Sequence, residues 1–209
     1  MYITVSFALA WAVSLPIWLS GGPDSPMLPA GLALTGIAMM FTPAVATAVV
    51  VFALRVPRGE RLRFLGMWPL RPTKRVVWFT VGAIFVPSVL VAVIALVSAA
   101  LGLVRLDLVG FSGFEATLAL QAAGLDPALI EAMPPAGLLV AIQLASIPLG
   151  ALINSVFAFG EEIGWRGWLL PALRPLGTWP ALLISGVIWG LWHSPLILLG
   201  YNFGYTDWR

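Results

Sequence analysis

The residues best suited to chemistry are four ionisable side chains in otherwise apolar surroundings. Glu161, Glu162 and Arg166 lie within six residues of one another, and His193, the only histidine of the chain, follows further on. At membrane depth each such group costs about 2.5–3.5 kcal/mol, so we expect the chain to use groups that it keeps close together. A glutamate base and a histidine can activate water for attack on a peptide carbonyl, with or without a metal ion.

Helical spacing separates the roles of the two acids. Glu162 and Arg166 are four residues apart with the acid first, which is the better orientation for an ion pair on a helix. Glu161 points about 100° away from Glu162 and shares a face with Asn154, two turns earlier. A buried carboxylate with no cation beside it is suited to accept a proton. We therefore predict a structural Glu162–Arg166 pair and a chemical role for Glu161.

Other interpretations account for parts of this pattern. Two glutamates and an arginine at helical spacing also suit an interfacial salt bridge at a helix end, and a lone histidine also suits a core position bonded to a backbone carbonyl. We expect Gly160, Gly164 and Gly167 to permit close helix packing in a membrane. Packing is also the expected role of the tryptophans in this region, which are Trp165, Trp168, Trp189 and Trp192. The zinc signature H-E-x-x-H is absent.

The composition indicates a membrane protein. Hydrophobic residues make up 60% of the 209 residues and charged residues 10%, with a mean hydropathy of +0.99. Soluble domains carry about 25% charged residues. We therefore predict an all-α, multi-pass transmembrane helix bundle, because helices satisfy their own backbone polar groups in lipid. The net charge of +2 does not indicate a nucleic-acid partner, since the positive charges cluster in one loop, and the absence of cysteine excludes disulfides and Cys metal sites.

Five apolar stretches are long enough to cross a bilayer, which takes about 20 residues. They are residues 2–20, 30–54, 76–103, a stretch within 136–173, and residues 179–199. We expect the fourth to break at Pro148, so that a helix over residues 149–173 places Glu161 near mid-membrane. The alternative is a span over residues 136–159 with the acidic pair at the cytoplasmic interface. A short helix on the membrane surface is expected within residues 114–133.

The basic residues predict the orientation. Residues 55–75 hold 7 of the 11 Lys and Arg residues and one acid, Glu60. The positive-inside rule places this segment, and with it the N-terminus, in the cytoplasm. The first apolar stretch has neither a basic n-region nor a cleavage site, so we expect a membrane helix rather than a removed signal peptide. A bacterial plasma membrane is the expected location.

The last two spans are expected to form an antiparallel hairpin that turns near Leu176. Glu161 precedes this turn by 15 residues and His193 follows it by 17. At 1.5 Å per residue both lie about 22–26 Å from the turn, so we expect the two side chains in one site. Residues 1–209 are predicted to form a single membrane domain whose motif-bearing core covers about residues 149–199.

The run from Glu161 to Arg166 resembles the E-E-x-x-x-R motif of the CPBP family, which includes type II CAAX prenyl proteases and bacteriocin-processing or immunity proteins. Trp189 to His193 resembles the second motif of that family, an aromatic residue followed by a histidine, and the two motifs are 32 residues apart. The resemblance implies an intramembrane endopeptidase. In it Glu161 would activate water, His193 would help to hold the water or a metal, and Glu162 with Arg166 would support the site.

The resemblance also sets the expected partners, which are the lipid bilayer and a peptide or protein substrate, lipidated or not. The family has a further motif, H-x-x-x-N or H-x-x-x-D, on a later helix, whereas this chain has no second histidine to precede Asn202. We therefore expect a C-terminally incomplete member. Zinc is the candidate cofactor, and His193 and Glu161 are an incomplete ligand set for it. The alternative functions are a non-catalytic role in bacteriocin immunity or partner binding, and a small transporter with a proton relay.

Overall fold

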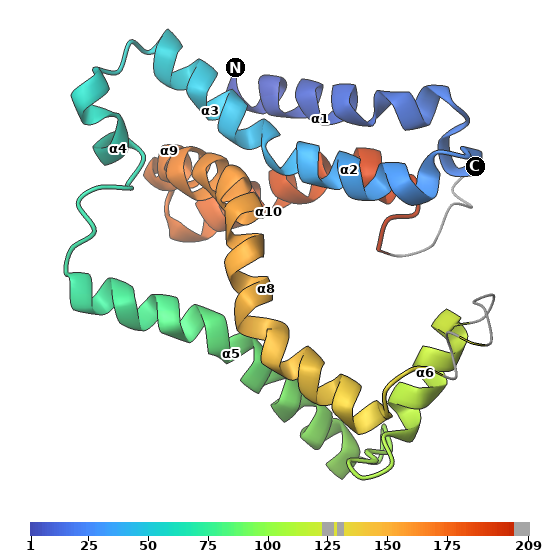
Figure 1. The fold of residues 1–209 in the computed structure, drawn as a ribbon. Helices are drawn as coiled ribbons and strands as arrows, with labels where there is room; N and C mark the ends of the chain where they lie inside the picture. Colours follow the sequence, from blue (N-terminus) through green and yellow to red (C-terminus); the bar gives the residue numbers. More distant parts are fainter. Residues whose placement is uncertain (123–127, 129–131, 203–209) are drawn as a thin grey trace. The chain divides into compact units, whose positions relative to one another are not determined.

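The structure is a computed structural model that describes residues 1–122, 128 and 132–202, and every regular element in these ranges is helical (Figure 1). The prediction of an all-α, multi-pass architecture is confirmed. The helical stretches long and apolar enough to cross a membrane are Tyr2–Leu19, Ala30–Ala53, Thr73–Ala100 and Ala136–Leu176. The chain divides into unit 1, which is Met1–Leu70 with Asn154–Arg209, and unit 2, which is Arg71–Ile153. The single membrane domain stays a prediction.

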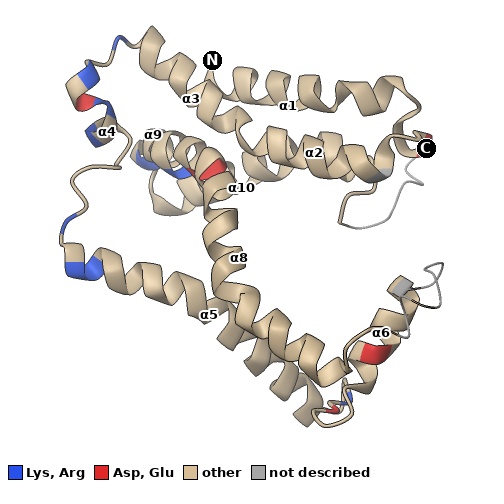
Figure 2. Cartoon of the chain, viewed as in Figure 1, with Lys and Arg blue, Asp and Glu red and all other residues tan. Residues whose placement is uncertain are grey.

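Unit 1 begins with two membrane-spanning stretches and a basic connection. Its elements in chain order are α1 (Tyr2–Leu19), η1 (Gly22–Asp24), α2 (Leu28–Met40), α3 (Thr42–Ala53), η2 (Arg58–Glu60) and α4 (Arg61–Phe64). The predicted second span is present, but it is divided at Phe41 because Pro43 has no N–H to continue the helix. Lys and Arg gather on η2, α4 and the start of α5, while α1, α2 and α3 carry none (Figure 2).

The C-terminal part of unit 1 forms the predicted hairpin. It contains the end of α8 (Ala136–Gly164), η3 (Trp165–Leu169), α9 (Leu170–Leu173), η4 (Arg174–Leu176), α10 (Thr178–Trp192) and α11 (Ser194–Ile197). The element η3 is one turn of π-helix. The chain reverses at Gly177, whose φ of 97° is a conformation that favours glycine. The turn expected near Leu176 is therefore confirmed.

Two predicted helix boundaries are wrong. The helix α8 runs without a break through Pro148. A proline removes one backbone hydrogen bond, and apolar helices tolerate this because neighbouring groups re-satisfy the freed carbonyl. The helix α10 ends at Trp192, because Pro195 has no N–H to continue the hydrogen bonds of the helix. At 15 residues α10 is shorter than a usual span.

The core of unit 1 joins both ends of the chain around α1. Ser6, Ala10 and Ser14 recur every fourth residue on α1 and are 0% exposed, so they form a stripe of small residues that lets helices approach closely. The helix α1 packs against α2, α3, α10 and α11. The indole N–H of Trp18 donates to the carbonyl of Pro195 at 3.2 Å, across 177 residues of sequence.

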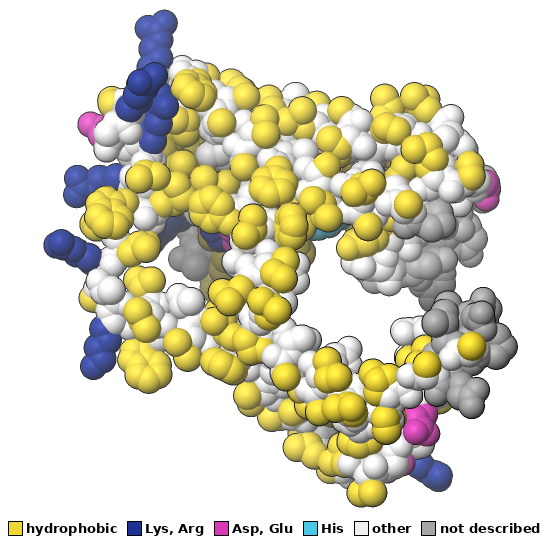
Figure 3. Space-filling view, in the orientation of Figure 1, with side chains coloured by type: hydrophobic (Ala, Val, Ile, Leu, Met, Phe, Trp, Pro, Cys, Tyr) yellow, Lys and Arg dark blue, Asp and Glu magenta, His cyan; other side chains and the backbone are white. Residues whose placement is uncertain are grey.

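Unit 2 contains α5 (Thr73–Ala100), α6 (Ser112–Ala122) and residues 136–153 of α8. No residue of α5 is buried, and hydrophobic side chains cover most of the face shown in Figure 3. Before α6, the carboxylate of Asp107 accepts the backbone N–H of Gly110 at 2.7 Å, and this bond with its neighbours lowers the pKa of Asp107. The helix α6 covers the start of the predicted surface helix, and most of the remainder lies outside the described residues.

Candidate active site

Close packing of glycines buries the first glutamate of the pair. A Cβ on Gly160 would lie 2.5 Å from the ring of Phe41, and one on Gly164 would overlap the side chains of Tyr2 and Pro43. Only glycine allows α8 to approach α1 and α3 this closely, which confirms the packing role predicted for these glycines. Glu161 lies between them and is 8% exposed.

The carboxylate of Glu161 has a specific partner on the neighbouring helix. The indole Nε1–H of Trp189 donates to Glu161 Oε1 at 2.5 Å. A neutral donor satisfies one carboxylate oxygen without supplying a positive charge. Packing is the expected role of Trp189, and this bond adds a polar one.

The same tryptophan also orients the histidine. His193 Nδ1 lies 2.9 Å from the backbone carbonyl of Trp189. A carbonyl can only accept, so Nδ1 carries a proton and, in the neutral ring, Nε2 is left as the acceptor. The rings of Trp189 and Trp192 each lie edge-on to His193 at 4.7 Å between centroids. The ring is thus held in one orientation and one tautomer.

A second tryptophan fixes this arrangement to the core. The indole N–H of Trp192 donates to the hydroxyl of Thr42 at 3.2 Å, and its ring lies 5.5 Å from that of Trp165. Trp192 and Trp165 are each 1% exposed. The buried bond joins α10 to the start of α3 across 150 residues, and it positions His193 through its immediate neighbour.

The side chains of the candidate site line one cavity of about 480 Å³ within unit 1. Its polar lining includes Glu161, His193, Asn154 and Asn202, and apolar residues of α2 cover one side. The predicted convergence of Glu161 and His193 is therefore observed. Asn154 lies on the cavity, as its shared face with Glu161 predicts. The position of Asn202 was not predicted, because it follows α11 and a chain reversal at Gly200 that helical periodicity does not describe.

The other two predicted site residues lie outside this cavity. Arg166 pairs with Glu162, as the spacing predicts. Their side chains are 58% and 45% exposed, respectively. Arg166 instead lines a smaller hollow of about 120 Å³ with Leu182 and Trp189. Trp189 therefore lines both the cavity with His193 and the hollow with Arg166.

The candidate zinc site has too few ligands among the described residues. No group of three or more His, Cys, Asp or Glu side chains in those ranges could hold a metal ion. Zinc in catalytic sites takes three protein ligands, whereas the cavity offers His193 and Glu161. These donors do not complete a site, and zinc stays a prediction.

Comparison with known proteins supports the resemblance carried by the two motifs. Residues 138–206 match the family model described as type II CAAX prenyl endopeptidase Rce1-like. This segment includes both motifs. The chain is also similar to the CAAX prenyl protease 2 of Methanococcus maripaludis, with 31% identity in a match that covers 34% of this chain and 34% of the relative. The match therefore spans about a third of the relative's length, and no solved structure matched the chain. The predicted resemblance to CAAX-type proteases is confirmed.

Proposed function

We propose that the Rce1-like segment of this chain forms the water-activating site of an intramembrane endopeptidase. The observation that carries the proposal is the single cavity shared by Glu161 and His193, in which Trp189 bonds to both. Similarity to the Rce1-like family over residues 138–206 supports peptide-bond hydrolysis as the reaction class. The position of Glu161 supports the assignment of the base, because its carboxylate is buried on the cavity that it shares with His193.

Glu161 is the general base in this mechanism. As the water oxygen bonds to the carbonyl carbon of the scissile peptide, a water proton passes to the carboxylate. Collapse of the tetrahedral intermediate then breaks the C–N bond, and the same proton passes to the leaving amine, so the carboxylate is regenerated. The bond from Trp189 occupies Oε1, which leaves Oε2 to receive the proton.

The remaining polar groups of the cavity position the reactants. His193 Nε2 accepts a hydrogen bond from the attacking water, because Nδ1 is committed to the Trp189 carbonyl. The carboxamides of Asn154 and Asn202 supply N–H donors for the oxyanion that forms on the carbonyl oxygen. Apolar residues of α2, among them Leu32 and Ile37, form a surface suited to the hydrophobic part of a substrate.

The proposed substrate is the C-terminal segment of a membrane-bound peptide or protein. The relative from Methanococcus maripaludis is named a CAAX prenyl protease, which makes a prenylated C-terminal peptide the first substrate to test. We propose a cytoplasmic N-terminus, as the basic segment 55–75 predicts, and a bacterial plasma membrane as the location.

The test measures cleavage of a fluorogenic peptide that ends in a prenylated cysteine and three further residues, with the unprenylated peptide as comparison. The purified protein in bilayer discs is expected to cleave the peptide. Glu161→Gln is expected to lower kcat/KM by about 10²- to 10⁴-fold, since it removes the base. The matched control is Glu115→Gln, the same change at an exposed residue of unit 2.

Two results would decide between the proposed and the alternative functions. Normal turnover by Glu161→Gln would contradict the general-base role. Absence of cleavage by a folded wild-type protein, with Glu161 dispensable for protection against a bacteriocin, would favour the non-catalytic alternative. Folding of each variant is checked by its thermal unfolding midpoint, so that a lost fold is not taken for lost chemistry.

A further inference from the structure

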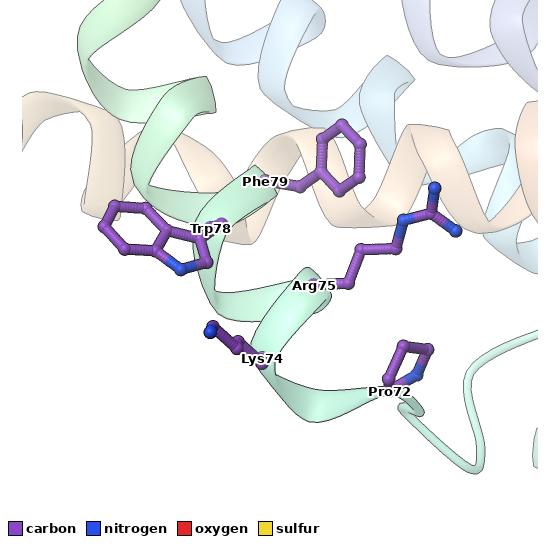
Figure 4. Close-up of a pocket in the computed structure, with 5 residues that line it drawn as sticks. All are labelled: Pro72, Lys74, Arg75, Trp78 and Phe79. Atoms are coloured by element: carbon purple, nitrogen blue, oxygen red, sulfur yellow. The ribbon is translucent and has the colours of Figure 1, made fainter.

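The first turns of α5 present a basic–aromatic cluster on the surface of unit 2 (Figure 4). Pro72, Lys74, Arg75, Trp78 and Phe79 line an open hollow of about 570 Å³. Lys74 lies one turn before Trp78, and Arg75 lies one turn before Phe79. The Arg75 guanidinium is 6.0 Å from the centroid of the Phe79 ring. Each pair places a cation one turn before a large aromatic ring. Trp78 and Phe79 are 66% and 69% exposed, respectively.

The positive charges of this cluster lack an acidic partner among the described residues. Neither Lys74 nor Arg75 forms an ion pair with any residue that the structure describes. Residues 61–106 contain no Asp or Glu, and the acids of unit 2 begin at Asp107, beyond the far end of α5. At 28 residues, α5 is about 42 Å long, which separates the cluster at its start from the acids that follow its end. Cations in the first turn of a helix also oppose its dipole, so an external anion would stabilise this end.

The length and apolar character of α5 place this cluster at a membrane–water boundary. The helix is long enough to cross a bilayer, and none of its residues is buried in the protein. Side chains of a helix lean toward its N-terminus, which carries the charged ends of Lys74 and Arg75 outward to the headgroup region. Tryptophan is favoured at that depth, and Trp78 lies one turn further in.

We propose that the basic–aromatic cluster binds an anionic phospholipid. Lys74 and Arg75 contact the headgroup phosphate, and an acyl chain lies along Trp78 and Phe79. Charge complementarity carries the choice of occupant, because the hollow combines two cations without acidic partners and an apolar wall that a free inorganic anion would leave uncovered. The site is independent of the cavity that holds Glu161.

The experiment titrates the full chain in detergent micelles with phosphatidylglycerol or phosphatidylcholine of identical acyl chains, and native mass spectrometry counts the bound lipids. The wild type is expected to bind phosphatidylglycerol more tightly. Each basic residue near an anionic lipid surface is worth about fivefold in binding, so the double variant Lys74→Gln/Arg75→Gln should lose about 25-fold of this preference. The variant Trp78→Ala should weaken retention of phosphatidylglycerol at unchanged net charge.

The matched control is Arg55→Gln/Arg58→Gln, which removes the same charge from the same basic segment but not from the cluster. This control is expected to keep most of the preference. Equal losses in the two double variants would overturn the proposal, since they would indicate a diffuse effect of net charge. Wild-type preference in Lys74→Gln/Arg75→Gln would also overturn it. So would complete displacement of the lipid by excess inorganic phosphate, which would assign the site to a free anion.

Discussion

Replacing Trp189 with phenylalanine tests how the candidate base is held. The change removes the indole N–H that donates to Glu161 at 2.5 Å. It keeps an aromatic ring beside His193 and keeps the backbone carbonyl that accepts from His193 Nδ1. The change therefore removes one hydrogen bond on the carboxylate together with part of the ring, and Trp179→Phe controls for the smaller ring.

The size of the effect follows from the kind of bond that is lost. A hydrogen bond to a charged group contributes about 1.5–3 kcal/mol. If the whole of that amount serves to orient the carboxylate during proton transfer, kcat/KM should fall by about 10- to 150-fold. Trp189→Phe should lower kcat/KM less when it is made in the Glu161→Gln variant than in the wild type. The two changes remove parts of one interaction, so their effects are not additive.

Two measurements check this expectation, one of them without a substrate. Peptide cleavage by Trp189→Phe is compared with that by Trp179→Phe, which removes an indole N–H from the exposed start of the same helix. In ¹⁵N-labelled protein, the indole signal missing from Trp189→Phe identifies the wild-type resonance of Trp189. That resonance should shift in Glu161→Gln, since the amide is a weaker acceptor than a carboxylate.

An identical Trp189 indole resonance in the wild type and in Glu161→Gln would show that the Trp189–Glu161 bond is absent. Cleavage of the peptide by Trp189→Phe as fast as by Trp179→Phe would also contradict the expectation. A shifted resonance together with unchanged cleavage would show that the bond exists but does not contribute to catalysis.

Three further predictions concern stability, each measured as the thermal unfolding midpoint in detergent. Gly164→Ala should destabilise the protein by about 1–3 kcal/mol because its Cβ has no room, whereas Gly186→Ala, with nothing within 4 Å of its Cβ, should be neutral or stabilising; equal midpoints would contradict the packing argument. Thr42→Val should cost about 1–3 kcal/mol, because it leaves the buried indole N–H of Trp192 without its acceptor, and an unchanged midpoint would show that the bond is dispensable. Tyr2→Phe should be neutral or stabilising, because the buried Tyr2 hydroxyl has no hydrogen-bond partner among the described residues, and a large loss of stability would contradict this.

Features set by local spacing could be predicted from the sequence. The Glu162–Arg166 pair follows from two residues one helical turn apart, which no tertiary contact needs to bring together. The approach of Glu161 and His193 followed from nearly equal distances to the turn, and Gly177 does reverse the chain there. Chain geometry accounts for the ion pair and for the similar depth of Glu161 and His193.

Features that depend on tertiary packing could not be predicted. The Trp189–Glu161 bond joins residues 28 apart and needs one rotamer of a side chain that also suits simple packing. The π-helical turn after Gly164 changes the phase of the helix by an inserted residue, and no sequence period signals it. Asn202 reaches the cavity after the chain turns at Gly200, and helical periodicity does not predict such a turn.

The pairing of both ends of the chain in unit 1 has a consequence for biosynthesis. Ribosomes deliver the N-terminal helices first, and domains generally fold as units once their parts have emerged. The helices α1 to α3 enter the membrane before the residues that complete their core are translated. The bonds of Thr42 with Trp192 and of Trp18 with Pro195 can form only later. Until then the hydroxyl of Thr42 lacks the indole N–H of Trp192, which donates to it in the folded protein. The cavity around Glu161 therefore cannot form before α10 and α11 have entered the membrane, because both helices supply residues that line it.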